Sequence, residues 1–138
     1  MTRSLAYYVT WLRKDFSEYC GRRLQEIGLS QGLLFFILYV GKHPGCSPKA
    51  LAEALRMDFG HVARSLSKLE QAGFIRQEQN PRDRRAHLLC LTDHGQTAFA
   101  LSYDLFDEWD REVLGQIEEA DREQLLALLG QLTPALEG

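Results

Sequence analysis

The feature that most constrains the fold of this chain is a turn, residues 80–85, that carries three arginines within four positions. It separates two short segments, residues 74–79 and 87–91, whose composition favours extended backbone. A helical pattern that ends at Gly73 comes directly before it. A β-hairpin with a cationic tip behind a helix is typical of the wing of a nucleic-acid-binding protein, and we predict a wing here.

Charge is divided unevenly along the chain, which has a net charge of -3 and a pI near 5.8. Residues 42–87 hold nine basic and five acidic side chains, a local charge of +4, so the remainder of the chain carries -7. The arginine turn therefore belongs to a cationic middle third between two acidic ends. A cationic surface confined to one part of an acidic protein favours a polyanionic partner such as nucleic acid.

Two short helical patterns precede the turn. Ser47-Pro48 supplies a helix cap and a proline at the first helical position, which predicts a helix over residues 48–55. Residues 56–60 are predicted to form a turn in which Asp58 caps a second helix. The buried stripe of this second helix consists of Val62, Leu66 and Leu69. Its polar and basic residues lie opposite that stripe, so the pair is predicted to be a helix-turn-helix.

Longer helices are predicted on both sides of this module. Residues 5–27 place apolar side chains at steps of mostly three and four, which predicts an amphipathic helix that ends at Gly28. Residues 33–40 are apolar on every side, a pattern that fits a buried helix or a buried strand. We interpret them as a helix because the run suits one in length and Ser30 can cap it.

After the hairpin, Thr92 is predicted to cap a long helical region that extends to about Ile117, and a final helix is predicted over residues 120–136. Both regions have broad apolar faces. The predicted fold is mainly α with a small β-hairpin wing, that is, a winged helix-turn-helix flanked by N-terminal and C-terminal helices.

Composition excludes several classes of protein. The chain is 45% apolar and 25% charged, as in ordered soluble proteins. Its longest apolar run, residues 33–40, is far shorter than the roughly 20 residues that cross a bilayer, and its start has no basic head before an apolar core, so we expect a cytoplasmic location at the nucleoid and no membrane partner. Three cysteines without CxxC spacing and four scattered histidines predict free thiols and no metal or other cofactor.

The order of these elements resembles the MarR family of bacterial winged helix-turn-helix transcription regulators. The family's wing signature, D-x-R-x5-L-T-x2-G, is matched by Asp83, Arg85, Leu91, Thr92 and Gly95. Segments 51–55, 62–64 and 69–73 are similar to the family's helix-turn-helix pattern. The resemblance covers nearly the whole chain, and its motifs are specific in their joint spacing.

The resemblance implies a homodimer in which terminal helices of both subunits intertwine, each recognition helix enters a major groove, and each wing lies at the adjacent minor groove. It divides the chain into an N-terminal dimerisation helix (1–30), a winged helix-turn-helix DNA-binding domain (31–92) and C-terminal dimerisation helices (93–138). The apolar faces of the flanking helices support a dimer independently, because they exceed what one small winged domain needs to cover itself. A two-fold dimer predicts a palindromic operator with half-sites about one helical turn apart.

The predicted function is sequence-specific binding of double-stranded DNA by a ligand-responsive repressor. The alternatives are a winged-helix protein-interaction module and a thiol-based redox-sensing regulator. An enzyme is not predicted, because the sequence has no nucleophile elbow, phosphate loop or convergent acid-base pair.

The predicted DNA-binding residues are Lys49, Gly60, His61, Ala63, Arg64, Lys68, Arg82, Arg84 and Arg85. The resemblance places Arg85 at the wing tip, where the negative potential of the minor groove attracts arginine. It places Arg64 on the recognition helix, where a guanidinium can pair bidentately with guanine, whereas Lys68 one turn later suits a phosphate. Asp83 is predicted to support the tip by orienting an arginine or by closing the turn through backbone N–H groups.

The chain departs from the family at Gly60, His61 and Ala63, where hydroxyl residues often stand before this arginine. The identity of the bases read is therefore open. His61 either donates to a base or phosphate or caps the helix.

The family commonly accepts small aromatic or lipophilic effectors, and the residues that could line such a pocket are Tyr8, Trp11, Phe35, Phe36 and Tyr39. Ordinary core packing is the favoured alternative for them, since aromatic residues at helical spacing usually pack. Of the cysteines, Cys46 is the better candidate for a redox role than Cys20, because the helix N-terminus near it favours thiolate. No role is assigned to Cys90.

Overall fold

The computed structural model describes residues 3–133, apart from the side chain of Arg84. This part of the chain forms six α-helices, one short 3-10 helix and a two-stranded antiparallel hairpin. The elements are α1 (Leu5–Glu26), η1 (Gln31–Leu33), α2 (Leu34–Lys42), α3 (Pro48–Leu55), α4 (Phe59–Gln71), β1 (Ile75–Asn80), β2 (Asp83–Leu91), α5 (Asp93–Leu114) and α6 (Glu119–Leu132). The predicted fold class, mainly helical with one hairpin, is confirmed.

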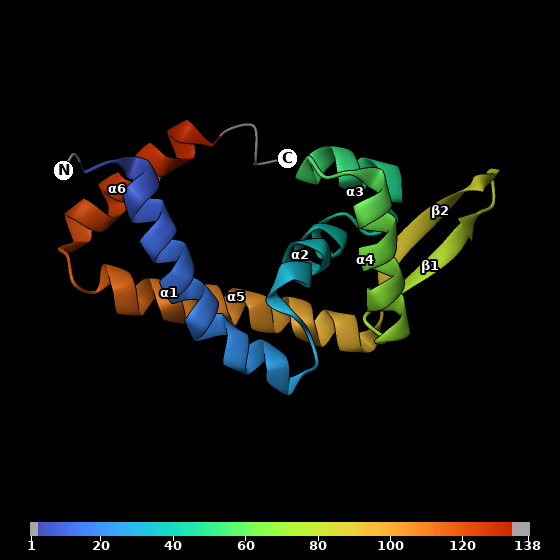
Figure 1. Cartoon of the computed structure of the whole chain (residues 1–138), viewed down its shortest axis with the longest axis horizontal. Helices are drawn as coiled ribbons and strands as arrows, with labels where there is room; N and C mark the ends of the chain where they lie inside the picture. Colours follow the sequence, from blue (N-terminus) through green and yellow to red (C-terminus); the bar gives the residue numbers. More distant parts are fainter. Residues whose placement is uncertain (1–2, 134–138) are drawn as a thin grey trace.

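The molecule is built along α5, which runs between its two ends (Figure 1). At one end lie α2, α3, α4 and the projecting hairpin of β1 and β2 (Figure 1). At the other end, the first turns of α1 and the whole of α6 lie together (Figure 1). The winged part thus lies away from α6 and the first turns of α1, and α5 is continuous between them.

The hydrophobic core lies in the winged part and in the second half of α1. Its largest fully buried side chains include Phe36 of α2, Leu66 of α4, Leu89 of β2 and Leu105 of α5. On α1, only Cys20 and Leu24 are buried, and α6 contributes no buried residue. The core therefore holds the winged elements against α5 and leaves the terminal helices with little cover.

Polar contacts fix α1 across α5. The Glu108 carboxylate accepts a hydrogen bond from the Tyr19 hydroxyl at 3.0 Å and pairs with the Arg23 guanidinium at 2.6 Å. One turn earlier on α1, the Asp15 carboxylate accepts a hydrogen bond from the Trp109 indole N–H at 2.9 Å. These contacts hold α1 at a fixed angle where it crosses α5. They therefore also fix the position of the exposed first half of α1.

Local signals for helix starts were mostly correct. Ser47, Asp58 and Thr92 each accept a hydrogen bond from the backbone N–H three residues later, as a capping side chain does. The predicted helix over residues 48–55 matches α3. The end predicted at Gly73 also agrees, since α4 ends two residues before this glycine, whose φ is +85°.

Three details of the predicted elements were wrong. The run 33–40 is helical as predicted, with Leu33 at the end of η1 and residues 34–40 in α2, but Ser30 makes no side-chain capping hydrogen bond. The turn predicted over residues 56–60 ends at Asp58, since Arg56 reverses the chain in a left-handed conformation (φ 54°) and α4 begins at once. The hairpin strands extend further toward the tip than predicted: beyond a register shift after Gln79, Asn80 still pairs with Asp83.

The final helix ends at Leu132, and positions 134–136 of its predicted span lie outside the described residues. In the described part of the chain, no single helix combines the length and apolar character needed to cross a membrane. Only α1 and the η1–α2 segment taken together meet that criterion, and they are bent by 93°.

Candidate nucleic-acid interface

The second helix of the helix-turn-helix, α4, is buried on one side and open on the other. Its inner side consists of Val62, Ser65, Leu66 and Leu69, all of them buried. The side chains of His61, Ala63, Arg64 and Lys68 are exposed. Since α4 is short and its buried stripe spans its full length, its polar side is presented as a rigid surface of the kind that enters a major groove.

Arg64 lies back along α4 toward the start of the helix. A Cβ at Gly60 would be 3.4 Å from the Arg64 Nη1 and 3.1 Å from the Asp58 Oδ2. The missing side chain at Gly60 therefore makes room for the guanidinium over the first turn. The Arg64 guanidinium is thus placed beside the N-terminal turn of α4.

The tip of the wing is shaped by two side chains that bind the backbone two residues later. The Asn80 Oδ1 accepts a hydrogen bond from the Arg82 N–H at 2.9 Å, and the Asp83 Oδ1 accepts one from the Arg85 N–H at 3.0 Å. Such contacts stabilise tight turns. Arg82 and Arg85 are exposed, whereas the side chain of Arg84 lies outside the described residues.

Among the side chains that the structure describes, three ion pairs are formed: Lys14–Glu18, Arg23–Glu108 and Arg76–Glu78. None of them involves the exposed cations of α4 or of the wing tip. The guanidinium groups of Arg64 and Arg85 are therefore available to a polyanion without a carboxylate to displace.

The base of the wing is fastened to the helices on each side. The Gln77 N–H of β1 donates to Glu70 of α4 at 3.0 Å. The stretch before α3 joins the sheet through an isolated antiparallel bridge between Cys46 and Leu89. The Leu89 N–H donates to the Cys46 carbonyl and the Gly45 N–H donates to the Leu89 carbonyl, both at 2.8 Å. The wing consequently moves with α3 and α4 as one body.

Thr92 and Gly95 connect the wing to α5. The Thr92 hydroxyl accepts from the Gly95 N–H at 3.0 Å and donates to the carbonyl of Gly73, which lies two residues after the end of α4. A Cβ at Gly95 would lie 2.0 Å from the Phe74 carbonyl oxygen, so the start of α5 packs directly on the backbone that follows α4. The geometry of α5 is thereby transmitted to the recognition helix.

A small concavity of about 260 Å³ lies where α3, α4 and the wing meet. Its lining residues are Ser47, Pro48, Lys49, Phe59, Asp83, Arg85, Ala86 and His87. It brings the predicted residues Lys49 and Arg85 to one place. It also contains Phe59, which the sequence analysis placed in the preceding turn and not among the DNA-binding residues. Its position directly after the helix cap Asp58 could have indicated that it begins α4.

The residues predicted for an effector pocket are dispersed within one protomer. Phe36 is fully buried in the core, and Tyr39 is half-buried with its ring 4.4 Å from that of His43. Phe35 is exposed on α2. Tyr8 and Trp11 are exposed on the first half of α1, in a different groove.

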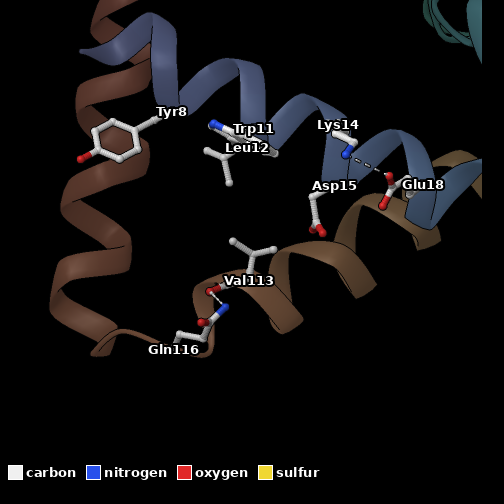
Figure 2. A pocket seen from close by; sticks show the side chains of 8 residues that line it. All are labelled: Tyr8, Trp11, Leu12, Lys14, Asp15, Glu18, Val113 and Gln116. Carbon is white, nitrogen blue, oxygen red and sulfur yellow. Dashed lines mark hydrogen bonds and ion pairs between the residues drawn. The ribbon is translucent and has the colours of Figure 1, made fainter. Parts of the chain in front are cut away.

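That groove, of about 490 Å³, lies between the first half of α1 and the end of α5. Figure 2 shows Tyr8, Trp11 and Leu12 on α1 facing it from one side and Val113 and Gln116 from the other. Around it, most apolar side chains of the terminal helices are uncovered. They include Leu5, Val9, Leu125, Leu126, Leu128, Leu129 and Leu132.

The ionisation of the Cys46 thiol differs from what the sequence predicted. Burial raises the pKa of the Cys46 thiol, so the predicted preference for thiolate at the nearby helix N-terminus is wrong in direction. Burial also raises the pKa of Cys20 to about 11, because the helix packing around it disfavours the charged form. Both thiols are free, as is that of Cys90.

Comparison with known proteins agrees with this geometry. The model of the MarR family matches residues 29–87, the span from just before η1 into the middle of β2. The HTH-type transcriptional regulator BilQ of Clostridium symbiosum (strain WAL-14163) is 45% identical over 132 residues, which is 96% of this chain and 92% of that protein.

Solved structures extend the similarity to the whole fold. The crystal structure of MarR superposes with a TM-score of 0.87 at 26% identity, over 97% of this chain and 92% of that one. The chain of the S. aureus MepR–DNA complex superposes with a TM-score of 0.82 over 98% of this chain and 100% of that chain, and at 20% identity it supports the fold alone.

Proposed function

Because this chain belongs to the MarR family of winged helix-turn-helix, DNA-binding transcription regulators, we propose that it acts as a homodimeric, ligand-responsive repressor on a palindromic operator. In each half-site, α4 enters the major groove and the wing lies at the adjacent minor groove. The observation that carries this proposal is the convergence of α3, α4 and the wing on one concavity, with exposed cations on α4 and at the wing tip.

The proposed contacts are divided by chemistry. Arg64 pairs with a guanine at the first turn of α4, since a guanidinium matches the two acceptors of guanine in the major groove. Lys68 and Lys49 neutralise phosphates, which positions the protein without reading sequence. Arg85 enters the minor groove, and Asp83 supports it by holding the backbone of the turn.

Fluorescence anisotropy with a labelled operator, selected from a random duplex pool, tests these contacts across a range of salt concentrations. The affinity is expected to fall linearly with salt on logarithmic axes, and Arg85→Ala should reduce the slope by about 1, as the loss of one phosphate-neutralising cation does. Arg76→Ala is the matched control, because Arg76 is an exposed arginine of β1 that pairs with Glu78 at 3.7 Å. Negligible affinity at low salt, or equal effects of the two substitutions, contradicts the proposal.

A homodimer is supported by the uncovered apolar side chains of α1 and α6. No residue of α6 is buried, and five of its leucines are at least 36% exposed. An apolar surface of this extent at one end of a protein is normally an interface, and self-association by two-fold symmetry covers it on both subunits at once.

Light scattering after size exclusion tests the dimer. The wild type is expected at twice the 15.8 kDa mass of the chain. Leu125→Glu should shift it toward the single-chain mass, whereas Ala127→Glu adds the same charge two residues later, on another side of α6, and should not. A wild type that elutes as a monomer at micromolar concentration contradicts the proposal.

The response to a ligand is supported by the continuity of α5. Its 22 residues correspond to about 33 Å of rigid helix. One end is attached to the residues after α4 through Thr92 and Gly95, and the other borders the groove lined by Tyr8 and Trp11. A small aromatic or lipophilic molecule that binds at the terminal helices and tilts α5 would therefore change the spacing of the two recognition helices.

Tryptophan fluorescence and operator affinity, measured on the same samples, test this response. Trp11 is 55% exposed, so a bound ligand should change its emission, and the same concentration should weaken operator binding. Transcription in vitro from a promoter that contains the operator should decrease when the protein is added and recover with the ligand. Increased transcription on addition of the protein contradicts repression.

A further inference from the structure

We infer that Phe59 is a specificity-determining residue of the DNA-binding surface, and that its ring contacts the 5-methyl group of a thymine in each operator half-site. This inference rests on the proposed docking of α4 in the major groove. It assigns a base contact to a residue that lies outside the cationic set, and so it concerns which sequence is bound rather than whether DNA is bound.

Phe59 is placed where base edges are read. It is the first residue of α4, directly after the cap Asp58. The residues of a recognition helix that touch bases are those near its N-terminus. Arg64 is directed to the same turn, since its Nη1 lies 3.4 Å from the Cβ position of the neighbouring Gly60.

The exposure of Phe59 has no structural explanation in the protomer. Its side chain is 55% exposed, whereas the apolar stripe of α4 that packs into the core is buried. Neighbouring Leu55 and Met57 are half-buried against that core, and Phe59 is not part of it. More than half of this side chain gains nothing from burial in the protomer, so a role in contact with a partner accounts for its exposure better.

The surroundings of Phe59 are those of a DNA-binding surface. The concavity that it lines also contains the cations Lys49 and Arg85 and the apolar side chains of Pro48 and Ala86. A ring held among phosphate-binding groups approaches the base edges when the cations bind the backbone. The apolar group that a base edge offers in the major groove is the thymine 5-methyl, and phenylalanine is one of the side chains that contact it.

The position of the thymine is constrained by Arg64. Since Phe59 and Gly60 are adjacent and Arg64 folds over Gly60, the two side chains reach the DNA close together. Successive base pairs are about 3.4 Å apart along the helix axis. The thymine is therefore expected within about two base pairs of the guanine that Arg64 contacts.

Replacing single thymines by deoxyuridine removes the 5-methyl group and nothing else, and this substitution tests the inference. Each thymine of the selected operator is replaced in turn, and dissociation constants are measured by anisotropy at low salt, where phosphate contacts keep weak variants measurable. For the wild type, one position in each half-site should show a loss of roughly fourfold, the factor that corresponds to about 0.8 kcal/mol for one buried methyl group.

The variant Phe59→Ala should bind the operator with thymine and the operator with deoxyuridine at that position with equal affinity. Losses of affinity caused by replacements at other positions should remain as in the wild type. Phe59→Leu, which retains an apolar contact, should restore part of the discrimination. Phe35→Ala is the matched control, because Phe35 is also exposed, at 58%, but lies on α2; it should keep the full wild-type discrimination. Thermal unfolding of all three variants by circular dichroism verifies that they are folded.

Three results overturn the inference alone: a wild type that is insensitive to every replacement, a Phe59→Ala variant that keeps the same penalty, and a selected half-site without thymine near the guanine. A ring that packs on sugar or folds into the concavity gives the first of these. A wild type that selects no sequence from the pool overturns the proposed function together with the inference, so the two failures are distinguishable.

Discussion

The hydroxyl of Thr92 is the point at which the wing, the recognition helix and α5 are joined. It caps α5 by accepting from the Gly95 N–H at 3.0 Å, and it donates to the Gly73 carbonyl. The backbone N–H of Thr92 also donates to the Phe74 carbonyl at 3.0 Å. This last bond survives any side-chain replacement, so substitution of Thr92 isolates the two hydroxyl contacts.

Thr92→Val keeps the shape of the side chain and removes both contacts. Loss of the cap costs about 1 kcal/mol, and loss of the second hydrogen bond costs about 1 kcal/mol more. The expected decrease in the free energy of unfolding is therefore about 2 kcal/mol. Thr92→Ser keeps the hydroxyl and an equally good cap, so its decrease should stay below about 0.5 kcal/mol.

Urea unfolding followed by circular dichroism measures these values. All three proteins must be compared at one protomer concentration, because a dimer gains stability with concentration. The slope of the free energy against urea should be the same for each, since no surface is added or removed. The reasoning is refuted if Thr92→Val is as stable as the wild type, or if Thr92→Ser loses as much as Thr92→Val.

Three further predictions concern close packing and thiol ionisation. Gly95→Ala places a Cβ 2.0 Å from the Phe74 carbonyl oxygen, so urea unfolding should show a loss of about 2 kcal/mol or more. Gly60→Ala places a Cβ 3.4 Å from the Arg64 Nη1, an ordinary contact with a flexible side chain, and alanine favours helix, so unfolding should change by less than about 0.5 kcal/mol and anisotropy should show operator affinity close to that of the wild type. Burial raises the pKa of Cys20 from 9.0 to about 11, which lowers its thiolate fraction at pH 8 about 100-fold; alkylation followed by peptide mapping should find it at least that much slower in native than in urea-unfolded protein.

Features that depend on a few neighbouring residues were predictable from the sequence. A capping side chain and its N–H partner are three residues apart, so Ser47, Asp58 and Thr92 carry their own signal. The same holds for the wing tip, where Asp83 binds a backbone N–H two residues later. These contacts need no knowledge of the remainder of the fold.

Features that depend on tertiary packing were not predictable in the same way. The direction of the pKa shift at Cys46 is set by burial beneath the wing, through the bridge to Leu89, and the sequence showed only the nearby helix start. Likewise, the effector-pocket prediction grouped aromatic residues of α1 and α2 that the protomer keeps apart, with Phe36 in the core and Trp11 exposed at the groove between α1 and the end of α5. Distances between helices are set by core packing, which spacing along the chain does not report.

The wing signature itself is mostly scaffold. Leu91 is buried, Thr92 and Gly95 attach α5, and Asp83 binds the backbone of the turn, so Arg85 alone presents a charged side chain to a partner. A match to this signature therefore predicts the geometry of the wing more strongly than it predicts an operator. Base preference must come from side chains free to vary on that scaffold. In this chain they are those of residues 59–64, where the Arg64 guanidinium lies beside Gly60 and Phe59 stands exposed.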